Sequence, residues 1–268
     1  MAQRKAIFVT GGGSGIGRAI AQLFAQRGWF VGLADINQAG MAETAALLPA
    51  GQSSSHVLDV RSPEQWRTAL EEFAQAAGGR IDVVANNAGV PSGGKIVDMT
   101  EDEIDRCLDI NLRGVVNGAR AAYPHLLKTA PGSCLINTCS AAGLYGSAGM
   151  SIYCASKFGV RAVTESLDGE WEPDGILVRS IMPSFIDTPL LQHSSHAADN
   201  VPIRERVMAA GLEFTPVEQV AEAAWNAAHG KKLHTLVGKT ARQLAFAAKW
   251  MPGRLRARAK NLAEASEG

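Results

Sequence analysis

Short apolar runs alternate with longer segments of helical spacing along most of the chain. Seven such runs, at 5–10, 29–34, 55–59, 81–85, 133–138, 176–182 and 233–237, indicate strands, most of them buried on both faces. Helical spacing is clear in residues 64–77, where Pro63 suits the first helical position, and in residues 100–127. Strands alternating with helices predict an α/β fold with one doubly wound parallel sheet, helices on both faces, and ligands at the strand carboxyl ends.

A glycine-rich turn joins the first strand to the first helix. Residues 10–17 read Thr-Gly-Gly-Gly-Ser-Gly-Ile-Gly. Glycines let a backbone approach a pyrophosphate, and the N–H groups and dipole of a helix N-terminus favour its negative charge. Although Gly-x-x-x-Gly-x-Gly also fits a flexible turn, this context predicts a dinucleotide site. Its members would be Gly11, Ser14, Gly15, Ile16 and Gly17.

An acidic residue ends the second strand. Asp35 lies 18 residues after Gly17, where a carboxylate can accept hydrogen bonds from the ribose hydroxyls of adenosine and repel a 2′-phosphate. Because neither Ser14 nor Ile36 is basic, NAD is favoured over NADP as the cofactor. The alternative is that Asp35 only caps the next helix.

The third and fourth strands also end in polar or small residues. Asp59, with Val60 beside it, is expected to meet the adenine. The fourth strand runs into Asn86, Asn87, Ala88 and Gly89. These side chains suit a wall against the adenosine and suit equally well a tie between neighbouring strands, and the sequence leaves both roles open.

Tyr153 and Lys157 stand four positions apart after the fifth strand. In a helix this spacing places the phenol and the ammonium on one face. Lowering a tyrosine pKa from about 10 to about 7 needs about 4 kcal/mol. One ammonium at about 4 Å supplies roughly that much at an effective dielectric of about 20. The pair predicts a proton donor and acceptor at neutral pH, although most such pairs on helices are not catalytic.

Two further polar residues stand near this pair in the expected fold. Ser140 comes just beyond the fifth strand, and Asn111 interrupts the helical region 100–127 within residues 110–114. An amide inside an apolar helix is unfavourable unless it is hydrogen-bonded. Asn111 is therefore either structural or a part of the surroundings of the lysine.

In this order and context, the motifs resemble the short-chain dehydrogenase/reductase family, over residues 5–191. The resemblance implies a Rossmann-like, NAD-dependent oxidoreductase that interconverts a secondary alcohol and a ketone, as a homo-oligomer (dimer or tetramer). Tyr153 would be the general acid/base, and Lys157 would lower its pKa and hold the nicotinamide ribose. Ser140 would bind the substrate oxygen, and Asn111 would hold a water in a proton relay. The alternatives are a 3-oxoacyl-thioester reductase, which usually prefers NADP, and a non-catalytic NAD-sensing or scaffold protein.

The segment after the sixth strand is similar to a Pro-Gly segment of the family. There a threonine and the nearby backbone, here Thr188 and Ile186, orient the carboxamide, but Ser184 stands where glycine is usual. Residues 184–212 are expected to form the substrate loop, in which His193 and His196 are more simply solvated. An apolar pocket would favour a hydrophobic small-molecule ketone or alcohol. Its members would be Leu144, Tyr145, Met150, Phe185 and Leu190.

Composition narrows the remaining classes. The chain has 26 basic and 26 acidic residues, no low-complexity linker and no run of ~18 apolar residues. One cytoplasmic domain over 1–268 without stable membrane insertion is expected, since no signal peptide is recognised. Four cysteines without Cys-x-x-Cys spacing predict neither a metal site nor disulfides.

The basic residues gather near the end of the chain. Residues 231–263 contain nine Lys or Arg and no Asp or Glu, and a helix is expected at 241–251, ended by Pro252. A solvated face is the favoured explanation for the basic tail at 241–268, which would pack on its own domain or a neighbouring subunit. Binding to anionic lipid or to an acidic substrate is the minor alternative. No nucleic-acid partner is expected, because base-reading motifs are missing.

Overall fold

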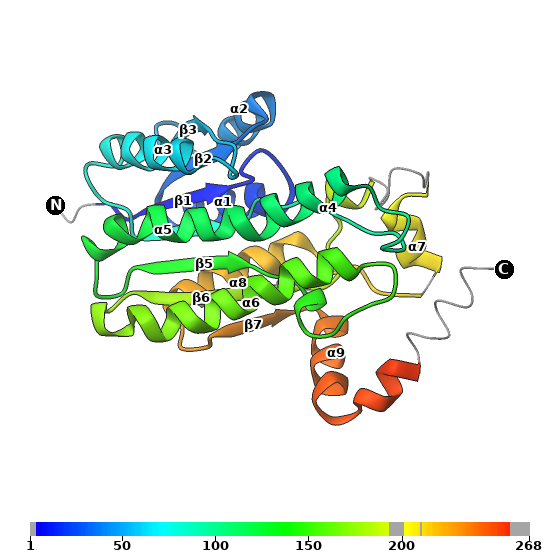
Figure 1. Cartoon of the computed structure of the whole chain (residues 1–268). Helices are drawn as coiled ribbons and strands as arrows, with labels where there is room; N and C mark the ends of the chain where they lie inside the picture. The colour runs from blue at the N-terminus through cyan, green and yellow to red at the C-terminus, as the bar shows by residue number, and fades with distance from the viewer. Residues whose placement is uncertain (1–3, 193–200, 210, 258–268) are drawn as a thin grey trace.

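The computed structural model describes residues 4–192, 201–209 and 211–257. Seven parallel strands form one sheet in the order β3-β2-β1-β4-β5-β6-β7 (Figure 1). The order reverses between β1 and β4, which is where doubly wound sheets place their ligands. The predicted sheet is confirmed. Its strands are β1 (Ala6–Thr10), β2 (Phe30–Asp35), β3 (Ser53–Val57), β4 (Val83–Asn86), β5 (Cys134–Thr138), β6 (Leu177–Pro183) and β7 (His234–Val237).

Helices cover both faces of the sheet (Figure 1). On one face α1 (Gly15–Gln26) packs beside α8 (Val217–His229), and α2 (Gln38–Ala46) lies next to α1. On the other face lie α3 (Pro63–Ala76), α5 (Gly114–Leu127) and α6 (Ser151–Trp171). Strand β1 separates two cores, because Ile7 and Val9 face one layer of helices while Ala6 and Phe8 face the other. This alternation explains why the strand is apolar at every position.

The remaining helices lie at the carboxyl end of the strands (Figure 1). They are α4 (Glu101–Leu108), α7 (Ile203–Ala209) and α9 (Lys239–Trp250). Short helical turns complete the chain as η1 (Asp109–Arg113), η2 (Ala141–Gly143), η3 (Glu172–Asp174) and η4 (Pro189–Gln192). None of the described helices is long and apolar enough to cross a bilayer.

Local sequence signals fix several helix ends. The Ser62 side chain accepts a hydrogen bond from the Gln65 N–H, and Pro63 occupies the first turn of α3, as expected. Thr100 and Glu103 form a capping box at the start of α4. The predicted interruption of the long helical region is confirmed, because the π-helical turn η1 separates α4 from α5.

Other boundaries differ from the sequence predictions. Strand β3 ends at Val57 rather than Asp59, because the backbone N–H of Asp59 donates to the Gln65 side chain instead of continuing the ladder. Helix α9 ends at Trp250, but residues 252–257 are helical again, so Pro252 begins a new helical segment. The sequence predicted no helix at 38–46, 203–209 or 217–229.

Candidate functional site

The glycine-rich turn forms a backbone cradle at the start of α1. Gly11 and Gly15 have φ values of 67° and 52°, in the left-handed region that favours glycine. A Cβ on Gly17 would lie 2.1 Å from the carbonyl oxygen of Gly11, so no larger residue fits there. The Ser14 side chain makes no capping hydrogen bond. The first N–H groups of α1 therefore lack the usual side-chain acceptor and are suited to an anion.

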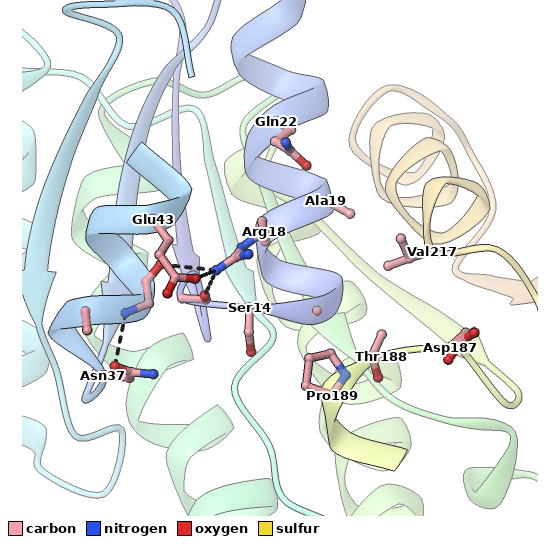
Figure 2. Close-up of a pocket in the computed structure, with 14 residues that line it drawn as sticks. Ser14, Arg18, Ala19, Gln22, Asn37, Glu43, Asp187, Thr188, Pro189 and Val217 are labelled. Atoms are coloured by element: carbon pink, nitrogen blue, oxygen red, sulfur yellow. Dashed lines mark hydrogen bonds and ion pairs between the residues drawn. The ribbon is translucent and has the colours of Figure 1, made fainter. Parts of the chain in front are cut away.

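A cleft of about 390 Å³ opens beside this turn (Figure 2). It lies between α1, the start of α2 and the segment after β6, and its lining includes Ser14, Asn37 and Thr188. A Cβ on Gly15 would lie 3.4 Å from the Thr188 Cβ. The segment predicted to orient a carboxamide therefore faces the glycine turn.

Asp35 ties the turn to the end of β2. Its Oδ2 accepts a hydrogen bond from the Gly13 N–H at 3.0 Å, and its Oδ1 accepts one from the Asn37 N–H at 2.9 Å. The N-cap of α2 is Asn37, whose side chain accepts from the Gly40 N–H at 3.0 Å. The alternative that Asp35 itself caps this helix is therefore wrong. Its contact with a ribose stays a prediction.

Arg18 lies in the cleft but was not among the predicted site residues (Figure 2). Its guanidinium donates to the Gly13 carbonyl at 2.7 Å, to Thr44 Oγ1 at 2.9 Å and to Glu43 Oε2 at 2.8 Å. Its position one helical turn after Ser14 could have predicted that Arg18 lies beside the glycine turn. Its partners on α2 were hidden because that helix was not predicted.

A row of hydrogen bonds joins the carboxyl ends of three strands. The Asn87 Nδ2 donates to the Thr10 carbonyl at 2.9 Å, and Thr138 Oγ1 donates to Asn87 Oδ1 at 3.2 Å. The Lys157 Nζ donates to the Thr138 carbonyl at 3.1 Å. Thr10 Oγ1 also accepts from the N–H groups of Asn87 and Ala88. The row therefore runs from the glycine turn to the predicted catalytic lysine.

A second set of amides lies deeper in the sheet. Asn86 Nδ2 donates to Asn137 Oδ1 at 3.0 Å, and Asn137 Nδ2 donates to Thr164 Oγ1 at 3.0 Å. All three residues are buried. Of the two roles left open for the 86–89 run, the tie between strands is what Asn86 and Asn87 do here. A wall against adenosine stays a prediction.

Asp59 and Val60 are already engaged by the protein. The Asp59 carboxylate accepts hydrogen bonds from the backbone and guanidinium of Arg61, which lower its pKa. The Val60 carbonyl accepts from Trp66 Nε1 at 3.0 Å and from Asn117 Nδ2 at 3.1 Å. Contact of either residue with an adenine stays a prediction.

Ser140 lies close enough to Tyr153 for its hydroxyl to act on the pKa of the phenol, in the lowering direction. Ser140 precedes η2, and its Oγ also accepts from the Ala142 N–H at 3.1 Å, which fixes the serine side chain. Tyr153 comes from the first turn of α6 and is partly exposed. Two hydroxyls from separate elements therefore lie near each other, an arrangement that suits contact with one substrate oxygen.

The pKa of Tyr153 differs from the sequence prediction. Burial raises the pKa of the phenol to about 12, against a smaller lowering by the nearby Ser140 hydroxyl. Lys157 does lie on the same face of α6, but its Nζ is 5.7 Å from the centre of the phenol ring and is bonded to Thr138. The predicted lowering by the ammonium is therefore wrong for this arrangement. Desolvation also lowers the pKa of Lys157, which is only 5% exposed.

Asn111 sits inside the π-helical turn η1 and is fully buried. Its Oδ1 accepts from the Val90 N–H at 2.8 Å, and its Nδ2 donates to the Val90 carbonyl at 2.9 Å. A Cβ on Gly89 would lie 3.1 Å from Asn111 Oδ1 and 3.7 Å from Lys157 Nζ. Asn111 therefore pins the chain that runs past the lysine, and π-helical turns often mark functional sites.

Comparison with known proteins agrees with this arrangement. A family model described as short chain dehydrogenase matches residues 5–199. The chain belongs to the short-chain dehydrogenase/reductase family.

Relatives within this family differ in what they act on. The chain is 37% identical over 191 residues to the 3-oxoacyl-acyl-carrier-protein reductase FabG of Thermotoga maritima, covering 70% of this chain and 76% of that one. It is 36% identical over 184 residues to the meso-2,3-butanediol dehydrogenase of Serratia marcescens, covering 69% and 72%. The crystal structure of a short chain dehydrogenase/reductase from Burkholderia phymatum in complex with NAD is similar in fold, with a TM-score of 0.83, 24% identity and coverage of 96% and 97%.

The residues predicted for a substrate pocket of this dehydrogenase lie in different settings. Leu144 packs against a small core cluster with Val115 and Val160, while Tyr145, Met150 and Phe185 are partly exposed. The side chain of Leu190 lies outside the described residues, as do His193 and His196. The pocket as a whole stays a prediction.

The segment that departs from the family pattern has an ordinary backbone, although the buried Ser184 hydroxyl has no hydrogen-bond partner among the described residues. No non-glycine residue in the described ranges has a positive φ, so Ser184 does not need the backbone freedom of glycine. Ile186 is buried and forms a bridge to Thr215, and Thr188 Oγ1 donates to the Ile186 carbonyl at 3.4 Å. The backbone of this segment is thus fixed beside the cleft.

The described residues contain neither a disulfide nor a cluster suited to a metal ion. All four cysteines are buried and unpaired by disulfides. Within 4–192, 201–209 and 211–257, no group of three or more His, Cys, Asp or Glu is arranged to hold a metal ion.

Replacing the buried lysine is expected to stabilise the dehydrogenase while impairing it. Because desolvation lowers its pKa, Lys157 destabilises the fold at neutral pH, and this effect fades as the pH rises towards its unfolded pKa of about 10.4. Lys157→Met should raise Tm by about 2–4 °C at pH 7. Thermal unfolding followed by circular dichroism checks this, with the exposed Lys128→Met as the control. A lower Tm for Lys157→Met at pH 7 would contradict the expectation.

Proposed function

We propose that this dehydrogenase is an NAD(H)-dependent oxidoreductase that interconverts a secondary alcohol and a ketone, with Tyr153 as its general acid/base. The proposal rests on the convergence of Tyr153, Ser140 and Lys157 at the strand ends that carry the glycine turn. Structural roles alone would not require two hydroxyls to converge beside a partly exposed surface.

The glycine cradle fits a dinucleotide. Because Gly17 has no side chain, the backbone of the turn can lie close to the N-terminus of α1, as pyrophosphate binding requires. Asp35 would bind the adenosine ribose, Lys157 the nicotinamide ribose, and Ile186 and Thr188 the carboxamide. The pyrophosphate would be held by Gly11, Ser14, Gly15, Ile16 and Gly17.

The residues of the chain would handle the proton. A bound nicotinamide dinucleotide supplies the acceptor of hydride in oxidation and its donor in reduction. Tyr153 accepts the hydroxyl proton of the alcohol in one direction and returns a proton to the ketone oxygen in the other. Ser140 donates a hydrogen bond to the same oxygen and stabilises the charge that develops on it.

Lys157 and Asn111 would support this chemistry without contacting the substrate oxygen. Lys157 would bind the nicotinamide ribose beside Tyr153, with its ammonium fixed by the hydrogen bond to the Thr138 carbonyl. Asn111 holds the 89–90 backbone next to the lysine, and would bind a water of a proton relay.

The charges of the cleft favour NAD over NADP. Asp35 presents a carboxylate at the end of β2, where it would repel a 2′-phosphate. Arg18 is the basic residue of the cleft lining, and Glu43 neutralises it through a hydrogen bond of 2.8 Å. No free cation is therefore provided for the extra phosphate by the residues that line the cleft.

A second candidate is the reduction of a 3-oxoacyl thioester. The 37% identity to the Thermotoga maritima reductase favours it. The two candidates share the same proton chemistry and differ in the substrate, so parallel assays with acetoacetyl thioesters and with a panel of apolar secondary alcohols distinguish them. A preference of more than about tenfold in kcat/KM for the thioester, the factor that about 1.4 kcal/mol represents, would replace the first candidate.

Removal of the Tyr153 hydroxyl should abolish turnover and spare cofactor binding. Tyr153→Phe deletes the general acid/base, whose contribution is typically about 10²–10⁴-fold in rate. The matched control is Tyr123→Phe, because the Tyr123 hydroxyl is bonded to Asp174 on a different part of the fold. NADH titration by fluorescence and steady-state assays separate the two effects. Near-normal kcat in Tyr153→Phe would exclude the assigned role.

Oxidation and reduction should respond differently to pH. Because burial raises the pKa of Tyr153 to about 12, the phenol is protonated throughout the neutral range. Reduction uses this protonated form and should be nearly flat between pH 6 and 8, whereas oxidation needs the phenolate and should rise up to about tenfold per pH unit. Initial rates in both directions measure this. An oxidation rate independent of pH from 7 to 9 would show that the phenolate is not required.

Removing the Asp35 charge should narrow the discrimination between cofactors. Asp35→Ala removes the repulsion of a 2′-phosphate, and the ratio of kcat/KM for NADH over NADPH should fall by about tenfold or more. Asp35→Asn keeps an oxygen that can accept the Gly13 hydrogen bond. It therefore separates the effect of the lost charge from the effect of a disturbed glycine turn. The exposed Asp102→Asn controls for net charge. A wild-type enzyme that prefers NADPH would refute the assignment outright.

A further inference from the structure

We propose that the outer face of α9 is a docking surface for an anionic lipid membrane. This face, called here the α9 outer face, consists of Lys239, Arg242, Phe246, Lys249 and Trp250. The residues recur at intervals of three and four, so they share one side of the helix. All five are exposed, with Phe246 at 58% and Trp250 at 64%. Two large aromatic rings therefore stand in solvent among three cations.

The opposite side of α9 holds the helix on the protein. Ala241 is fully buried, and Leu244 and Ala248 are partly buried on the same side. Through this side α9 packs against β7 and η2. The α9 outer face is therefore not the side through which the helix packs on the rest of the protein. It is a preformed surface with a fixed orientation, at the carboxyl end of the strands (Figure 1).

The charge on this face is not neutralised within the described residues. No ion pair of Lys239, Arg242 or Lys249 is found there, and Lys249 instead lies over the Trp250 ring at 4.9 Å from its centre. The following helical segment at 252–257 adds two exposed arginines, at 254 and 256. No Asp or Glu occurs anywhere from 231 to 263, although the whole chain carries 26 of each sign. The positive charge is thus a local feature.

An anionic bilayer surface matches both parts of this face. Tryptophan and phenylalanine rings settle at the headgroup level, and lysine and arginine lay their methylene stems along apolar surface while the charged ends reach lipid phosphates. Each basic residue near an anionic bilayer strengthens binding by about fivefold. Because η2 follows Ser140 directly, docking would hold the candidate active site close to the bilayer. This inference does not depend on the proposed reaction.

Sedimentation with vesicles tests the proposal on the full chain. Vesicles of phosphatidylcholine alone are compared with vesicles containing about one-third phosphatidylglycerol, at low salt and at about 0.5 M salt. We expect at least about tenfold more bound protein on the anionic vesicles at low salt, and loss of this difference at high salt. Equal binding to both vesicle types, or none to either, would overturn the proposal.

Two variants address the two parts of the face. Lys239→Glu/Arg242→Glu/Lys249→Glu reverses the charge and should reduce partitioning onto anionic vesicles by about 100-fold or more. Phe246→Ser/Trp250→Ser removes the rings and should reduce it by about tenfold. Unchanged partitioning in either variant would contradict the assigned role of that part of the face.

Matched controls keep the same changes away from α9. Arg67→Glu/Lys231→Glu/Lys232→Glu alters net charge equally at exposed positions, and Leu47→Ser/Val57→Ser removes side chains that are 56% and 54% exposed. Both should bind within about threefold of the unaltered protein, since neither touches the α9 outer face.

A protein contact would be revealed without vesicles. Light scattering measures the mass of the assembly for each variant, and thermal unfolding shows that each variant folds. A change in assembly mass on replacing Phe246 and Trp250 would make this face a contact between subunits and would overturn the membrane proposal.

Discussion

The hydrogen-bonded row at the carboxyl ends of β1, β4 and β5 is the constraint on which the candidate site depends. Asn87 and Thr138 each use both a donor and an acceptor within it, Thr10 accepts at one end, and Lys157 donates at the other. Removing the side chain of Asn87 would leave its partners in a partly buried place without their hydrogen bonds, and each unmade bond costs about 1–3 kcal/mol. Because the row joins the glycine turn to α6, the cradle and the reactive side chains cannot shift independently.

The same row explains why a buried lysine is retained. Lys157 loses hydration, as the lowering of its pKa shows, and the hydrogen bond to Thr138 offsets only part of that loss. Burial also raises the pKa of Tyr153, which keeps the phenol protonated. Burial in one crowded environment thus disfavours the charged form of both groups. A fold selected for stability alone would favour an apolar side chain at position 157, so function is the simplest reason for the charge.

The sequence predicted the frame of the site better than its contacts. Buried strands and the glycine turn follow local rules, and Asn111 revealed an interruption of a helix because an amide is conspicuous in an apolar run. The Arg18–Glu43 pair joins helices α1 and α2, and local pattern cannot place two such helices relative to each other. The spacing correctly predicted that Tyr153 and Lys157 share one face of a helix. It could not show that the Lys157 ammonium would donate its hydrogen bond to the Thr138 carbonyl.

Asp35 links the proposed cofactor selectivity to the backbone structure around it. Its two oxygens hold the N–H groups of Gly13 and Asn37, so the same carboxylate that would exclude a 2′-phosphate also fixes the turn and the start of α2. A basic residue substituted for Asp35 to bind that phosphate would leave the N–H groups of Gly13 and Asn37 without their acceptor. Arg18 alone cannot bind the 2′-phosphate, because its guanidinium already donates to Glu43 and to the Gly13 carbonyl. A change of preference in this fold therefore requires the turn, the aspartate and the Arg18–Glu43 pair to be altered together.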